Sequence, residues 1–219
     1  MLKKLIALFT VVSVFTTLNA QETEGHVAYT VEFSSKQPEM QMYTGMLQGS
    51  KLDMYFADGK SRTEMKVGTM METVNIVDSK SKKMLTLLSG MMGKKAITET
   101  IEKKTDETPK FKVELINETK DIAGYSCKKA LITDEEGNKY TFWYTDKIKI
   151  NTEGQKYFDG YGIPGFPLQM EIGQNGMDIK MVATIFEKLP KKHKLFDMEV
   201  PEGYQVMTKE EMEKMMGGM

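Results

Sequence analysis

Residues 52–67, LDMYFADGKSRTEMKV, decide the fold. Apolar side chains stand at every second position from 52 to 56, and charged ones do so from 62 to 66. Between these runs lies Asp58-Gly59, the dipeptide that best suits a tight hairpin turn. Successive side chains of a strand point to opposite faces, so we expect an antiparallel hairpin with one wet face.

The same pattern recurs on both sides of this hairpin. A strand is expected over 26–35, and further hairpins over 72–88, 125–145 and 168–186. Roughly nine to eleven strands are too many for one flat sheet, so strong curvature is expected. The sequence therefore predicts a mainly β fold, in which a strongly curved antiparallel sheet forms a barrel or a sandwich.

Two helices complete this prediction. Residues 38–47 have the spacing of a short apolar helix. A C-terminal helix is expected to begin after Thr208, because Thr208 and Glu211 form a capping box. That helix is predicted to end near Gly217.

The N-terminus resembles a secretory signal peptide. Lys3 and Lys4 precede an apolar run that ends at Phe15, and cleavage is expected between Ala20 and Gln21. We therefore predict a signal peptide over residues 1–20 and one β-rich domain over 21–219, periplasmic or secreted. An uncleaved membrane anchor is the alternative, and the mature chain contains no further apolar stretch that could span a membrane.

Composition argues against most enzyme classes. The net charge of −1 argues against a nucleic-acid binder, and the chain has one cysteine and two histidines. No GxSxG or HExxH motif occurs, and the GxGxxG match at 160–165 is followed by prolines rather than a helix. Cys127 is expected to be a buried, inert thiol, and His26 an isolated surface or structural residue. We therefore expect no catalytic residue, metal site or cofactor, and no enzyme activity.

Methionine is the compositional outlier, with 20 among 219 residues. Flexible thioethers suit surfaces that adapt to varied apolar ligands. Two alternatives remain open: methionine as simple core filler, and Cu(I) handling, because Cu(I) prefers sulfur ligands.

Four segments together resemble a known family. They are Asp121–Ala130 (DIAGYSCKKA), Phe142–Asp146 (FWYTD), Gly162–Glu171 (GIPGFPLQME) and Leu195–Tyr204 (LFDMEVPEGY). In this order they resemble an exported bacterial family of unknown function, grouped with the LolA-like outer-membrane lipoprotein carriers. The resemblance covers roughly residues 26–207. It implies a half-barrel with an apolar concave face and short lid helices.

This resemblance and the methionines together predict a carrier that shelters a lipid or the acyl chain of a lipoprotein. Burying an acyl chain gains about 0.8 kcal/mol per CH₂ group. Lipid, acylated protein or another envelope protein are the expected partners, and a non-enzymatic structural role in the envelope is the alternative. The candidate residues of the groove are Met54, Phe56, Val74, Ile76, Leu85, Leu87, Met170, Met177, Ile179 and Met181. The candidate residues of the lid are Met42, Met46, Met91 and Met92.

Overall fold

The computed structural model describes residues 21–91, 93–101, 111–150, 161–174, 176–190 and 194–217, so the predicted signal peptide lies outside the described residues. The elements in chain order are β1 (Gly25–Ser34), α1 (Pro38–Met46), β2 (Ser50–Ala57), β3 (Lys60–Val67), β4 (Met71–Asp78), β5 (Lys83–Gly90), β6 (Lys95–Thr100), β7 (Lys112–Ile122), β8 (Tyr125–Thr133), β9 (Lys139–Thr145), β10 (Phe166–Gln174), β11 (Met177–Glu187), β12 (Gln205–Val206) and α3 (Lys209–Gly217).

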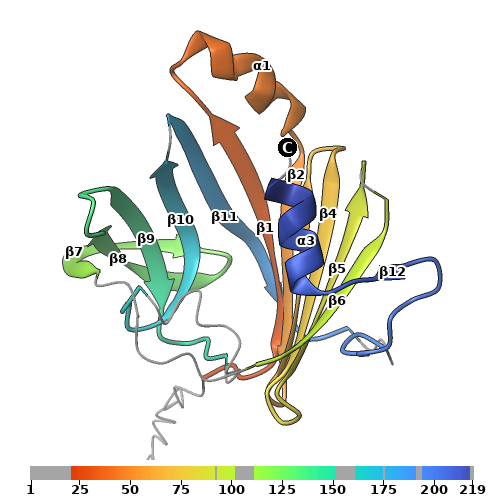
Figure 1. Ribbon diagram of the computed structural model, residues 1–219. Coiled ribbons are helices and arrows are strands. Elements are labelled where there is room, and N and C mark those ends of the chain that lie inside the picture. The colour runs from red at the N-terminus through yellow and green to blue at the C-terminus, as the bar shows by residue number, and fades with distance from the viewer. Residues whose placement is uncertain are drawn as a thin grey trace, which may run out of the picture.

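These strands form one 12-stranded sheet in the order β12-β6-β5-β4-β3-β2-β1-β11-β10-β9-β8-β7. All pairings are antiparallel except the short parallel pairing of β12 with β6. Figure 1 shows an open, twisted fan, with β7 at one end of the sheet, β12 at the other and α1 beyond the ends of the central strands.

Local sequence explains most of these elements. Asp58 and Gly59 both have positive φ, at 50° and 76°, as the two central residues of a type I′ turn require. The four predicted hairpins are confirmed as β2–β3, β4–β5, β8–β9 and β10–β11. The predicted capping box is confirmed as well. The Glu211 amide donates to Thr208 Oγ1 at 3.2 Å, and the Thr208 amide donates to Glu211 Oε2 at 2.8 Å.

The sheet buries side chains on both faces. The first core gathers residues of β1, β2 and β8–β10, including Val27, Met54, Phe56 and Met170. The second core consists of Val74, Ile76, Leu85, Leu87 and Ala96, on β4–β6. The two cores lie on opposite faces, because Val74 and Ile76 pair with Glu64 and Arg62 of β3, whose partners on β2 alternate with Met54 and Phe56.

The predicted half-barrel is wrong, although the mainly β, antiparallel class with two short helices is confirmed. The sheet is neither strongly curled nor closed. Alternation predicts which side chains share a face, but it does not predict what covers that face. Here Phe196, Met198, Val200 and Tyr204 cover the second core. Twelve strands can therefore bury both faces without closing.

Candidate functional site

A row of polar side chains crosses four neighbouring strands at the centre of the sheet. His26 of β1 pairs with Glu187 of β11 and with Tyr55 of β2, and Tyr55 pairs with Arg62 of β3. Two pairs further along, and so on the same face, Asp53 pairs with Glu64. Cross-strand partners share a face, so these side chains are neighbours. We call this set the polar row: Glu187, His26, Asp53, Tyr55, Arg62 and Glu64.

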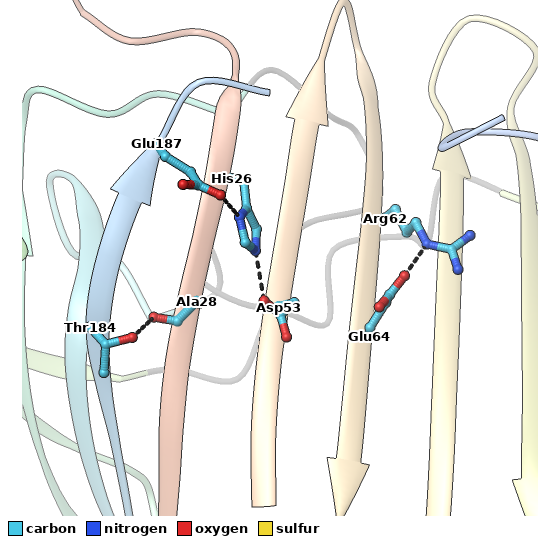
Figure 2. Close-up of polar contacts among 7 residues, drawn as sticks. All are labelled: His26, Ala28, Asp53, Arg62, Glu64, Thr184 and Glu187. Carbon is cyan, nitrogen blue, oxygen red and sulfur yellow. Dashed lines mark hydrogen bonds and ion pairs between the residues drawn. The ribbon is translucent and has the colours of Figure 1, made fainter. Parts of the chain in front are cut away.

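His26 lies at the centre of the row, with both ring nitrogens engaged. Nδ1 is 2.9 Å from Glu187 Oε1, and Nε2 is 2.6 Å from Asp53 Oδ1 (Figure 2). The ring stacks on Tyr55 with centroids 4.3 Å apart and an interplanar angle of 6°. Only 9% of the His26 side chain is exposed. The imidazole is therefore fixed by its neighbours and has no nitrogen left for a ligand.

Tyr55 contributes a neutral phenol. Burial, and then the negative charges of Glu64 and Asp53, raise its pKa to about 12, although Arg62 acts in the opposite direction. A phenol with this pKa keeps its proton at neutral pH, so its hydroxyl can both donate and accept hydrogen bonds.

Arg62 is the only arginine of the chain. Its Nε donates to Glu64 Oε1 at 2.5 Å, as Figure 2 shows, and its Nη1 donates to the Leu195 carbonyl at 3.4 Å. Leu195 is buried and begins the segment that covers the second core. Arg62 therefore ties the polar row to this segment.

The carboxylates of the row can be reached from solvent. The exposed fractions of their side chains are 30% for Asp53, 31% for Glu64 and 56% for Glu187. They stand opposite one guanidinium and one imidazole. The row thus offers carboxylate acceptors, a guanidinium and a phenol, held on adjacent strands rather than on loops.

A β-bulge brings Glu187 to this face. Ala28 pairs with Ile185 but Tyr29 pairs with Ala183, so Thr184 is an extra residue on β11. Its Oγ1 donates to the Ala28 carbonyl at 3.1 Å. Ala183 belongs to the first core. Under strict alternation Ile185 and Glu187 would share its face, so the bulge is what turns them to the His26 face.

The geometry limits the chemistry of the row. In the described part of the chain, no group of three or more His, Cys, Asp and Glu side chains is placed to hold a metal ion. The imidazole is enclosed, so it is suited to positioning the carboxylates on either side of it. The row as a whole places hydrogen-bond acceptors and donors side by side on one face of the sheet.

A cavity of about 330 Å³ opens where β3 and β5 end and where β4 and β6 begin. We call it the methionine cleft. It is almost entirely apolar and includes Met91, whose side chain is 87% exposed. Its lining residues are Tyr43, Leu47, Val67, Met70, Met71, Leu88, Ser89, Gly90, Met91, Gly93, Lys95 and Met212.

The structure distributes the predicted groove residues between the two cores. Met54, Phe56 and Met170 are buried in the first core, and Ile179 and Met181 pack against it. Val74, Ile76, Leu85 and Leu87 are buried in the second core, on the opposite face. Met177 is partly buried. None of these side chains lines the methionine cleft.

The predicted lid residues are placed differently. Met42 and Met46 are exposed on α1, and Met91 lines the cleft. Met92 lies outside the described residues. Sequence reasoning missed the polar row and treated His26 as isolated, since the contacts of His26 come from residues 27 and 161 positions away. One signal was available in the sequence. His26, Tyr55 and Arg62 all belong to predicted strands in which apolar and polar side chains alternate.

Cys127 is buried, as expected. Burial raises the pKa of its thiol to about 11, although nearby Lys120 acts in the opposite direction. In the described residues, no helix is long and apolar enough to cross a membrane.

Comparisons with known proteins add to this geometry. The family model of PNGase F-II described as "N-glycanase peptide, N-terminal domain" matches residues 39–206. No curated protein sequence matches the chain. The structure of PNGF-II in space group C2 is similar at 18% identity and a TM-score of 0.47, over 84% of this chain and 31% of that one. An uncharacterized conserved protein from Thermus thermophilus is similar at 11% identity and a TM-score of 0.45, over 87% of this chain and 93% of that one. This chain thus spans less than a third of the PNGF-II chain.

The family match corrects three predictions. The resemblance to LolA-like carriers is wrong, and so is the carrier function, together with its envelope and Cu(I) alternatives. The expectation of no enzyme activity is also corrected, because the matching family is named after an N-glycanase. The segments behind the resemblance have structural roles: Asp121–Ala130 contains the β7–β8 turn, and Leu195–Tyr204 covers the second core. Turns and covering segments of this kind do not identify a ligand.

Proposed function

Since this chain belongs to the family described as "N-glycanase peptide, N-terminal domain", we propose that it functions in N-glycan processing. In this role it would be a domain that engages the carbohydrate of an N-linked glycoprotein. Family membership is the observation that carries the proposal. The polar row is the surface that we assign to the carbohydrate.

The chemistry of the row fits a sugar. Each sugar hydroxyl both donates and accepts hydrogen bonds, so it is best bound where acceptors and donors stand side by side. The carboxylates of Asp53, Glu64 and Glu187 accept, and the Arg62 guanidinium donates. Hydrogen bonds to ionised groups are stronger than those between neutral groups.

The position of the row supports the same assignment. Five of its residues lie inside the matched range 39–206, and only His26 lies before it. The first core packs behind the row on the reverse face, which fixes the strands that carry it. A rigid support of this kind reduces the entropy lost when a flexible oligosaccharide binds.

Export is part of the proposal. The signal-like sequence at residues 1–20 suits a protein whose substrate is an extracellular glycoprotein. We propose that residues 21–219 form one exported domain, and amino-terminal sequencing of the secreted chain tests the cleavage site after Ala20.

The test is binding of a glycopeptide that carries a neutral, mannose-terminated N-glycan, measured by calorimetry beside the same peptide without glycan. We expect the wild type to bind only the glycopeptide, and Glu64→Gln to weaken binding about tenfold, because an ionised acceptor is lost. Glu114→Gln is the matched control, since Glu114 is an exposed strand residue of β7. Equal binding of both peptides, or unchanged binding by Glu64→Gln, contradicts the proposal.

A further inference from the structure

The inference starts from the surroundings of the His26 ring. Each ring nitrogen faces a carboxylate oxygen, at 2.9 Å for Glu187 and 2.6 Å for Asp53. An ionised carboxylate only accepts hydrogen bonds, and a neutral imidazole has a single N–H to donate. Only the doubly protonated ring can therefore donate to both carboxylates at once.

From this geometry we propose that protonation of His26 regulates the polar row, so that its carbohydrate binding is strongest when the ring carries both protons. The part that concerns carbohydrate rests on the proposed function. The part that concerns the ring rests on the two contacts alone.

The groups that face the ring come from three strands. Glu187 approaches from β11, Asp53 and Tyr55 from β2, and the Arg62–Glu64 pair lies one strand further on β3. Two carboxylates thus contact the ring, while the nearest guanidinium is paired with Glu64. Tyr55 stacks on the ring as a neutral phenol, and the face of an aromatic ring attracts a cation.

Loss of one ring proton has a defined consequence. One nitrogen then presents a lone pair to a carboxylate, so that contact changes from attraction to repulsion. Glu187 is the partner free to leave, because more than half of its side chain is exposed, whereas Asp53 is held at 2.6 Å. Movement of Glu187 removes one acceptor from the row and weakens binding.

The direction with pH follows from these contacts. Both hydrogen bonds exist at low pH, and one is lost as rising pH removes a ring proton. Binding and resistance to unfolding should therefore both fall as the pH rises. A hydrogen bond to a charged group corresponds to about a tenfold change in binding or more.

Two measurements test the proposal. The ¹⁵N chemical shifts of the histidine side chains, recorded between about pH 5.5 and about pH 8.5, report whether each nitrogen carries a proton across the range where histidines usually titrate. His193→Gln assigns the signals, because the chain has only two histidines. Calorimetry with the neutral glycopeptide at the same two pH values measures binding, and the uncharged glycan keeps the ligand itself from titrating.

We expect both His26 nitrogens to be protonated at the lower pH, and wild-type affinity to fall about tenfold at the higher pH. Glu187→Gln should bind weakly at both values, without this pH dependence. Glu114→Gln should behave as the wild type. Since Glu187 is largely exposed, Glu187→Gln is expected to fold, whereas substitution of His26 itself endangers the sheet.

The outcomes separate the two proposals. A singly protonated ring throughout overturns the inference, and so does wild-type affinity that is the same at both pH values. If the glycopeptide does not bind at any pH, the proposed function fails. The ring is then still tested by its ¹⁵N shifts, and by whether the melting temperature of the wild type falls with rising pH more than that of Glu187→Gln.

Discussion

The polar row and the methionine cleft differ in what holds them in shape. In the row, short hydrogen bonds and a stacked ring pair fix each side chain, and the first core packs behind it. The cleft is bordered by thioethers such as Met71 and Met91, which are exposed and have several rotatable bonds. The high methionine content of the chain draws attention to the cleft, but the side chains with fixed geometry are in the row.

The largest expected difference is in the free energy of unfolding, between a substitution in the first core behind the row and one at the cleft. Phe56 is 1% exposed, so Phe56→Ala should lower the free energy of unfolding by about 3–5 kcal/mol. Met91→Ala, at the mouth of the cleft, should change it by less than about 0.5 kcal/mol. Urea denaturation of both variants measures these values. Similar losses for the two variants would mean that the cleft is packed as tightly as the core.

The reactivity of sulfur atoms sharpens the comparison, because Cys127 lies in the first core behind the row and exposed methionines border the cleft. Since burial raises the pKa of Cys127 to about 11, only about one thiol in a thousand is ionised at pH 8, and the thiolate is the form that reacts. Iodoacetamide should therefore alkylate the folded chain at least about a hundredfold more slowly than the urea-unfolded chain. Mass spectrometry measures both rates.

Dilute peroxide applied to the folded protein provides the converse measurement. It should oxidise exposed Met71 and Met91, which line the cleft, to sulfoxides before it reaches buried Met54 and Met170. Rapid alkylation of folded Cys127, or equal oxidation of all four methionines, would contradict the contrast between a sealed core and an open cleft.

Asp53→Asn tests the row itself. The variant replaces a charged acceptor 2.6 Å from His26 Nε2 by a neutral amide, so we expect a loss of about 1.5–3 kcal/mol in the free energy of unfolding. Urea denaturation measures this loss, with Glu114→Gln as the control for removal of a strand carboxylate. If Asp53→Asn is as stable as that control, the contact with His26 does not hold the row.

Local sequence was sufficient for the hairpins and for the start of α3. The Asp58-Gly59 turn and the pair of Thr208 and Glu211 depend only on residues close in the chain, and the structure contains both. The open sheet could not be predicted in this way, because its second face is covered by the distant segment Leu195–Tyr204.

The row was missed for a related reason. Strict alternation placed Ile185 on the face of Ala183, but one extra residue, Thr184, moves everything after it to the opposite face. A bulge of this kind leaves no mark in the hydrophobic pattern when the extra residue is a threonine. The partners of His26 then depend on pairing across 161 residues, which no local signal contains.

The smallest expected effect concerns the wall of the cleft. Thr208→Ala removes the side-chain cap of α3, which should cost about 1 kcal/mol of helix stability, while Thr208→Ser should retain the cap. Met212 of this helix is buried against the cleft, so fraying of α3 should loosen the cleft and leave the row unchanged. Hydrogen exchange measured by mass spectrometry should show faster exchange in α3 of Thr208→Ala, and the wild-type rate in β1–β3. Faster exchange in β1–β3 as well would mean that the two regions open together, and that the rigidity of the row depends on the helix beside the cleft.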